Sequence, residues 1–289
     1  MNRVILEKVF NRFFAKNGPD FDDFQTLADI AEILLPQQIN DLRMVIMPIL
    51  NHSTLIGLTF SKPFGYSGDF FIMEKIYQKY ISQDEKSRKW DMYFHSMHAV
   101  DAISNRKDLA KKILSAQNNR LDASGKSVLI LGSGPATEVH EYLSQTPENK
   151  LSFDLVDIDQ RAIDYARNKN KAFLQNMRFL NENVIRYSPE KKYDLIWSAG
   201  LFDYFKDKHF VYLLKKYYEY ITPGGEMIIG NFNRQNISRR CMEVYGDWYL
   251  YHRSEEELAA FAQQAGIPPS KIKIMKEPLG INLFLSVKK

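Results

Sequence analysis

The chain has 289 residues, 45% of them hydrophobic and 26% charged, a composition typical of a globular protein with a sizeable core. Its formal net charge of +4 comes from mixed charges rather than from a basic run, which gives little support for nucleic-acid binding. A single cysteine excludes an internal disulfide and a cysteine-rich zinc site, and it favours the reducing cytoplasm. No apolar segment reaches the ~18 residues of a membrane span, so we expect neither a membrane anchor nor a secretion signal.

The first 120 residues have the apolar periodicity of helices. Residues 4–14, 24–35 and 39–46 place apolar side chains at i, i+3 and i+4 spacing. A segment rich in turn residues follows at 61–69, and two further helical segments come after it. We therefore expect an N-terminal helical domain over residues 1–120, which shapes the substrate site and closes over the cofactor as a lid.

From residue 126 the pattern changes to short apolar runs that alternate with helical segments. Strands that alternate with helices indicate right-handed βαβ units on a parallel sheet. The runs lie at 127–131, 153–156, 177–180, 193–197 and 226–229. Two last runs, 271–275 and 281–287, have no helix between them, so we expect an antiparallel hairpin at the sheet edge. Residues 121–289 are thus predicted to form an α/β, Rossmann-like domain with a mostly parallel sheet.

The turn after the first predicted strand is rich in glycine. It reads Gly132-Ser133-Gly134-Pro135, and glycines at this place let backbone N–H groups approach a bound group closely. Asp157 stands twenty-three residues beyond Gly134, at the end of the second predicted strand. An acidic side chain at this distance accepts hydrogen bonds from ribose hydroxyls. The two features together predict an adenosine-type cofactor at the carboxyl ends of the strands.

Two features of other nucleotide sites are missing. A dinucleotide fingerprint places a third glycine at position 137, where this chain has Thr137, and a Gly-Lys-Ser/Thr phosphate loop is also absent. Binding of a pyrophosphate or a nucleoside triphosphate therefore loses support, and S-adenosyl-L-methionine (SAM) is the predicted cofactor. An NAD(P)-dependent oxidoreductase is the alternative that Thr137 and the terminal hairpin disfavour.

The ordered motifs from residue 129 to residue 225 resemble those of class I SAM-dependent methyltransferases. They are the glycine turn with its preceding strand, Val156-Asp157-Ile158-Asp159, Asn181-Glu182-Asn183-Val184, Tyr193 to Gly200, and Thr222-Pro223-Gly224-Gly225. The resemblance implies that the turn faces the methionine moiety, and that Asp157 binds the ribose while Ile158 lies against adenine. It also implies that Asn183 bonds the adenine amino group, beside Val184, and that residues 198–200 border the methyl-transfer pocket. The implied cofactor residues are Gly132, Ser133, Gly134, Pro135, Asp157, Ile158, Asn183, Val184, Ser198, Ala199 and Gly200.

A narrower resemblance covers nearly the whole chain. Its motifs are Pro63 to Asp69, Ser198 to Tyr204, Gly230-Asn231-Phe232, and Met242 to Arg253. They are similar to bacterial methyltransferases associated with the synthesis of 3-hydroxypalmitic acid methyl ester. This resemblance implies methyl transfer to a small-molecule acceptor, such as the carboxylate of a hydroxy fatty acid or of another small acid. An RNA methyltransferase and a non-catalytic SAM-binding protein are the remaining alternatives.

Four residues are candidates for catalysis. Tyr66 and Asp69 lie in the glycine-containing segment, which is either a linker or a lid over the cofactor. Asp203 and Tyr204 follow the strand where this fold binds acceptors, although Tyr204 is equally compatible with the core.

Six further residues are candidates for binding the acceptor. Asn231 follows the fifth predicted strand, and Arg106 is suited either to an anionic group or to a solvated face. The run from Trp248 to Arg253 is either a buried aromatic strand or a pocket lining made by Tyr249, Tyr251, His252 and Arg253. His95 and His98 lie about one helical turn apart without a third ligand, so no metal site is predicted.

Overall fold

The computed structural model describes residues 3–50, 53–120 and 125–289, which form two compact units. Unit 1 comprises Met1–Asp101 and Asn236–Tyr249, and unit 2 comprises Ala102–Gln235 and Leu250–Lys289. The sequence predicts a division near residue 120, whereas these units divide within helix α7 (His98–Asn118). A segment from the C-terminal half of the chain completes unit 1.

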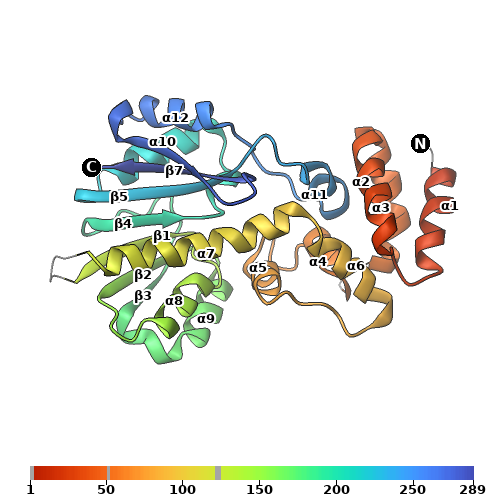
Figure 1. The fold of residues 1–289 in the computed structure, drawn as a ribbon, viewed down its shortest axis with the longest axis horizontal. Helices are drawn as coiled ribbons and strands as arrows, with labels where there is room; N and C mark the ends of the chain where they lie inside the picture. Colours follow the sequence, from red (N-terminus) through yellow and green to blue (C-terminus); the bar gives the residue numbers. More distant parts are fainter. Residues whose placement is uncertain (1–2, 51–52, 121–124) are drawn as a thin grey trace. The chain divides into compact units, whose positions relative to one another are not determined.

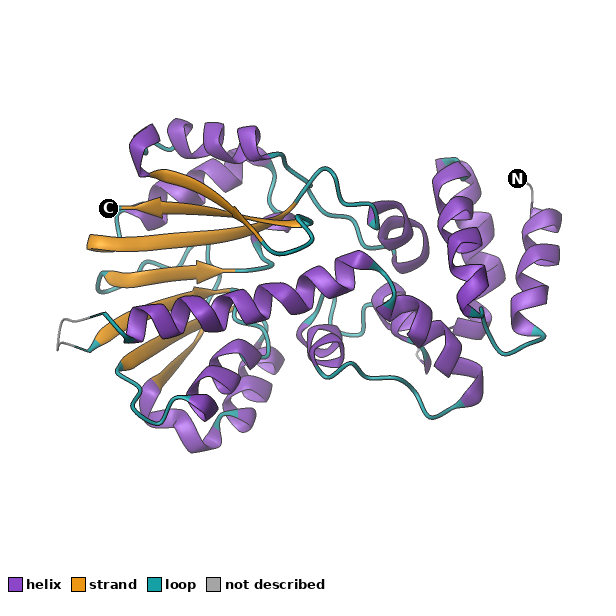
Figure 2. Ribbon diagram, in the orientation of Figure 1, coloured by secondary structure: helices purple, strands orange, loops and turns teal. Residues whose placement is uncertain are grey.

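Helices make up the regular structure described in unit 1, as the apolar periodicity predicts (Figure 2). Pro36 begins the third helix, because proline is well accommodated at the first helical position. Buried apolar side chains such as Leu6, Leu27 and Leu42 form the core, and the hydroxyl of Tyr245 donates a hydrogen bond to the Leu27 carbonyl at 2.7 Å. The helices are α1 (Arg3–Phe14), α2 (Phe24–Ile33), α3 (Pro36–Leu50), α4 (Leu55–Ser61), α5 (Phe70–Tyr77), α6 (Glu85–His95) and α11 (Arg239–Gly246), with the 3₁₀ turn η1 (Phe21–Asp23).

Unit 2 is built on a seven-stranded mixed sheet of order β3-β2-β1-β4-β5-β7-β6 (Figure 1). Strands β1 to β5 pair in parallel, while β7 pairs antiparallel with both β5 and β6. The predicted Rossmann-like sheet and its antiparallel C-terminal hairpin, with β6 at the edge, are confirmed. The strands are β1 (Lys126–Leu131), β2 (Leu151–Asp157), β3 (Met177–Asn181), β4 (Tyr193–Ser198), β5 (Ile221–Phe232), β6 (Ile272–Lys276) and β7 (Asn282–Lys288).

Alternating apolar side chains of the strands form two core layers, one on each face of the sheet. Ala110 of α7 and Val139 of α8 pack on one face, and Phe210 of α10 and Leu258 of α12 pack on the other. Figure 1 shows α7 running along its face of the sheet. The other helices of unit 2 are α8 (Thr137–Gln145), α9 (Gln160–Lys169), α10 (Asp207–Tyr218) and α12 (Glu255–Gln264), with the 3₁₀ turns η3 (Lys171–Asn176), η4 (Phe202–Tyr204) and η5 (Pro269–Lys271).

The carboxyl ends of the parallel strands gather at one edge of the sheet. The ends of β2, β1, β4 and β5 are Asp157, Leu131, Ser198 and Phe232. In open α/β sheets this edge is where ligands bind. None of the described helices is long and apolar enough to cross a membrane.

Candidate active site

The glycine turn after β1 is locked to the end of β2. The amides of Gly132 and Ser133 both donate to the Val156 carbonyl, at 2.9 and 3.0 Å. Gly132 and Gly134 have φ angles of 67° and 50°, which L side chains rarely adopt. A Cβ on Gly132 would lie 2.9 Å from the Cβ of Leu201, whereas a Cβ on Gly134 would enter open space. The turn thus leaves room for a ligand at Gly134.

Asp157 joins this turn to the second strand. One carboxylate oxygen accepts from the Gly134 amide at 2.8 Å and the other from the Asp159 amide at 2.9 Å. Burial raises the pKa of Asp157, and these backbone donors offset part of that effect. Each oxygen keeps a lone pair for a ribose hydroxyl. Asp159 has a separate role, since it accepts from the Arg161 amide at 2.9 Å and caps α9.

An apolar surface lies beside Asp157. Ile158 is 66% exposed, whereas the neighbouring Asp157 is buried. The side-chain nitrogen of Asn181, the last residue of β3, donates to the Ile158 carbonyl at 2.9 Å, so the segment after β3 begins beside Ile158. In that segment Asn183 accepts from the Ile185 amide at 2.9 Å, and Val184 is buried. The exposed aliphatic side chain of Ile158 offers an apolar surface of the kind that suits the flat face of adenine.

The segment after β4 forms the other side of the site. The Ser198 hydroxyl donates to the Leu131 carbonyl at 2.8 Å, which ties β4 to β1. A Cβ on Gly200 would lie 2.8 Å from a terminal nitrogen of Arg106, so Gly200 allows this guanidinium to approach the backbone. Ala199 lies close to β5, because a Cβ on Gly230 would be 2.4 Å from the carbonyl oxygen of Ala199.

Arg106 is a buried cation at this edge of the sheet. Its side chain is 6% exposed, and its positive charge acts on the carboxyl groups of Glu138 and Asp203. Burial raises the pKa of Glu138, which lies in the first turn of α8. The sequence does not indicate Glu138 as a site residue, because only the folded structure brings it close to Arg106.

Asp203 is a fully enclosed carboxyl group on η4. It accepts a hydrogen bond from the Phe232 amide at 2.7 Å. Burial raises the pKa of Asp203 to about 6, although the Phe232 amide and the charges of Arg106 and Arg253 oppose the shift. A carboxyl group with this pKa can take up or release a proton near neutral pH.

Arg253 and Asn231 form a buried network around Asp203. Arg253 donates to the side-chain oxygen of Asn231 at 2.7 Å, to the Phe205 carbonyl at 2.5 Å and to Asp207 at 2.9 Å. The side-chain nitrogen of Asn231 donates to the Tyr251 carbonyl at 2.9 Å. The structure therefore gives both residues a scaffold role, which joins η4, the end of β5 and the segment after it.

The other aromatic candidates differ in exposure. Tyr251 is 43% exposed and Tyr204 half-buried, whereas His252 is buried with Nδ1 3.1 Å from the Leu250 carbonyl oxygen. All three belong to unit 2. Tyr249 is 52% exposed and belongs to unit 1.

Tyr66 and Asp69 lie in a well-anchored segment of unit 1. Asp69 is fully buried and caps α5, since one oxygen accepts from the amides of Phe71 and Ile72, both at 2.9 Å. The Ser67 hydroxyl donates to the Asp247 carbonyl at 3.0 Å. Tyr66, directly before the first of these anchors, is half-buried. The segment has a fixed backbone shape, as its glycines and proline suggest.

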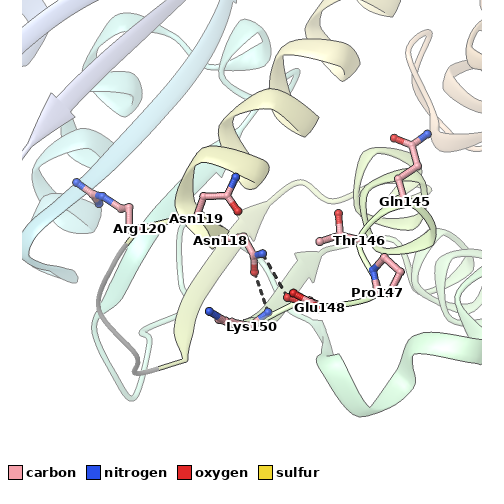
Figure 3. A pocket seen from close by; sticks show the side chains of 8 residues that line it. All are labelled: Asn118, Asn119, Arg120, Gln145, Thr146, Pro147, Glu148 and Lys150. Atoms are coloured by element: carbon pink, nitrogen blue, oxygen red, sulfur yellow. Dashed lines mark hydrogen bonds between the residues drawn. The ribbon is translucent and has the colours of Figure 1, made fainter.

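A separate pocket lies at the opposite ends of the strands from the glycine turn (Figure 3). The side chain of Asn118 bridges its wall, because it accepts from the Lys150 amide at 2.8 Å and donates to the Glu148 carbonyl at 3.4 Å. Its lining is Asn118, Asn119, Arg120, Gln145, Thr146, Pro147, Glu148 and Lys150. These residues lie at the amino ends of β1 and β2, away from the glycine turn. The described residues contain no group of three side chains suited to a metal ion.

The sheet order, the glycine turn and the carboxylate at the end of β2 define the class of this domain. It has the Rossmann-like fold of class I methyltransferases, and the cofactor of this class is SAM. The residues fit that cofactor, because the space at Gly134, the lone pairs of Asp157 and the exposed Ile158 lie along one edge of the sheet.

Comparisons with known proteins agree with this class. Residues 128–225 match a family described as "Methyltransferase domain". Malonyl-(acyl-carrier protein) O-methyltransferase 1 of Ilyobacter polytropus is 30% identical over 109 residues, which cover 38% of this chain and 39% of that protein. The chain thus spans about two fifths of the length of this curated relative, and 40% of a second one from the same organism.

Solved structures share the fold. A chain described as a possible exported protein from Bordetella parapertussis is 13% identical with a TM-score of 0.68, over 93% of this chain and 96% of that one. Magnesium protoporphyrin IX methyltransferase from Synechocystis PCC 6803, solved with bound S-adenosylhomocysteine (SAH), is 11% identical with a TM-score of 0.54, over 76% and 94%. At these identities the likeness concerns the fold alone.

Proposed function

We propose that the protein transfers the methyl group of SAM to the carboxylate of a small acid, such as a hydroxy fatty acid. The observation that carries this proposal is the buried cation of Arg106, which lies on α7 beside Gly200 and whose charge acts on the buried carboxyl group of Asp203. A buried cation favours an anionic acceptor. The whole-chain resemblance to the methyltransferases of 3-hydroxypalmitic acid methyl ester synthesis supports the hydroxy acid, and the name of the Ilyobacter relatives supports an oxygen acceptor.

The reaction is an in-line displacement. A carboxylate oxygen of the acceptor forms a bond to the methyl carbon, the bond from that carbon to sulfur breaks, and its electron pair neutralises the sulfonium. The protein's contribution is then mainly to align the reacting atoms and to exclude water. The proposed cofactor contacts are those of the glycine turn, Asp157, Ile158, Asn183 and residues 198–200.

Asp203 and Arg106 have complementary proposed roles. The carboxyl group of an acceptor tends to keep its proton when it enters a buried site. The positive charge of Arg106 favours the ionised form of the acceptor. Asp203, with a pKa of about 6, takes up that proton. The other proposed catalytic residues are Tyr66, Asp69 and Tyr204. The proposed acceptor contacts are Tyr249, Tyr251 and His252. Asn231 and Arg253 form the scaffold around Asp203.

The test is an incubation with methyl-labelled SAM and a panel of 3-hydroxy acids, other small acids, amines and a transfer RNA, followed by mass detection of the products. Methyl esters of acids are the expected products. Methylated RNA would favour the RNA methyltransferase. SAM binding without any product from the panel would favour the non-catalytic alternative.

A further inference from the structure

Asn282 is an unexplained polar side chain at the carboxyl edge of the sheet. It is fully buried, and neither its side-chain oxygen nor its nitrogen has a hydrogen-bond partner among the described residues. A buried amide without partners is costly, because it has lost its hydrogen bonds to water without replacement. Native structures contain few such groups, and each requires an explanation.

The polar groups of the turn before Asn282 are satisfied. Glu277 accepts from the amides of Ile281 and Asn282 with one oxygen, at 2.7 and 3.1 Å, and from Asn105 with the other at 2.8 Å. Asn233 donates to the Gly280 carbonyl at 2.8 Å. The backbone around Asn282 is therefore held firmly, while both polar atoms of its side chain lack partners, as does Nε1 of the buried Trp197 on the same face of the sheet.

The direction of the Asn282 side chain follows from the alternation along β7. Leu283 and Leu285 belong to the core layer beneath α10 and α12, while Phe284 belongs to the opposite layer and stacks on Trp197 at 5.6 Å. Asn282 shares the face of Phe284, which is the face that α7 covers. Its position in the sheet is directly opposite Phe232 of β5. The amide of Phe232 is the group that Asp203 binds.

We infer that Asn282 is a specificity-determining residue, which binds the methyl acceptor through a hydroxyl group next to its carboxylate. This inference rests on the proposed function and adds to it the feature of the acceptor that the site selects. An amide presents a donor and an acceptor side by side. A 3-hydroxy acid satisfies both, since its hydroxyl donates to the Asn282 oxygen and its carboxylate accepts from the nitrogen. A simple fatty acid offers no donor and leaves the oxygen unpaired.

The test compares binding of 3-hydroxydecanoate and decanoate to the complex of the protein with SAH, by calorimetry. The wild type is expected to prefer the hydroxy acid by about 10-fold or more, the effect of one additional buried hydrogen bond. Asn282→Leu should bind the two acids equally while its affinity for SAH stays unchanged. It should also melt at the same or a higher temperature, because it removes an unsatisfied buried amide.

The matched control is Asn233→Ala. Asn233 is also a buried asparagine of this region, but its amide is satisfied, so the variant should lose stability and keep the preference for the hydroxy acid. If Asn282→Leu does not fold, Asn282→Ala takes its place in the binding comparison. Equal binding of the two acids by the wild type, no binding of either, or a preference that survives in the Asn282 variant would overturn the inference. Failure of the wild type to bind SAH would instead contradict the proposed function itself.

Discussion

Asp203 links stability and activity at the scale of a single residue. Burial raises its pKa from 3.8 to about 6, so ionisation of this group costs folding free energy. The stability that it contributes is complete below pH 3.8 and is lost as the pH rises through about 6. At ~1.4 kcal/mol per pKa unit, the loss amounts to about 3 kcal/mol. A group that destabilises the folded protein at neutral pH is expected where chemistry requires it.

We therefore expect Asp203→Asn to retain or increase stability at neutral pH while it loses methyl transfer. The asparagine oxygen can still accept from Phe232, and no charge is buried. The wild-type rate should fall below pH ~6, and the variant should lose ~10-fold or more in rate at neutral pH, together with that pH dependence. Thermal unfolding and pH–rate profiles measure the two effects.

Asp194→Asn is the matched control. Asp194 lies at the amino end of β4, where it accepts from the Ser127 amide at 2.9 Å, and it should not affect the pH–rate profile. An Asp203→Asn variant that melts lower but keeps the acid limb of the profile would contradict a catalytic role and leave a structural one.

Gly132 and Gly134 should respond differently to alanine. Gly132→Ala places a Cβ against Leu201, so it should lower the free energy of unfolding by ~1–3 kcal/mol. Gly134→Ala meets only the strain of its positive φ, but its Cβ fills space that we assign to the cofactor. It should therefore lose more affinity for SAH than stability, as calorimetry and thermal unfolding would show. Unchanged SAH affinity in Gly134→Ala would contradict the placement of the cofactor.

Sequence spacing predicts some of these residues and not others. The separation between Gly134 and Asp157 is a local property of one βαβ unit, so the sequence predicts it, and the structure shows the two residues hydrogen-bonded. The contact of Arg253 with Asn231 joins segments that only the folded sheet brings together. The sequence does show Asn282 as a polar residue within the apolar run from Ile281 to Val287. It does not show that the side chain is buried without hydrogen-bond partners, which only the folded structure reveals.

At the scale of elements, Asp69 carries a testable structural role. It caps α5 through two amides, so Asp69→Ala should cost ~1–2 kcal/mol of stability. Asp69→Ser keeps a capping oxygen and should retain most of that stability, as thermal unfolding would measure. If Asp69→Ser is stable yet loses methyl transfer, Asp69 acts in catalysis as well. A stable Asp69→Ala variant would contradict the capping role.

The strands were predictable because each is a short apolar run between turn residues. The length of β5 was not, since Ile221 to Gly225 join the strand through a register shift against β4 that an apolar pattern does not reveal. Pro36 shows the same limit for helices, because a proline that ends one apolar stripe also begins the next helix.

At the scale of the whole molecule, the division of the chain depends on packing between distant segments. Residues 236–249 follow β5 in the sequence but belong to unit 1, where Tyr245 of α11 bonds Leu27 and Arg43 forms an ion pair with Asp247 at 2.9 Å. The sequence of this segment carries helical and aromatic patterns alone, which do not specify the partner against which it packs.

Calorimetric titration of the protein with SAH and with NADH tests most directly whether the glycine turn and Asp157 bind SAM. We expect SAH to bind and NADH not to bind. Asp157→Ala should weaken SAH binding by ~2–4 kcal/mol, the effect of losing hydrogen bonds to a charged group. Binding of NADH in place of SAH, or equal SAH affinity in Asp157→Ala and the wild type, would contradict the assignment of this site to SAM.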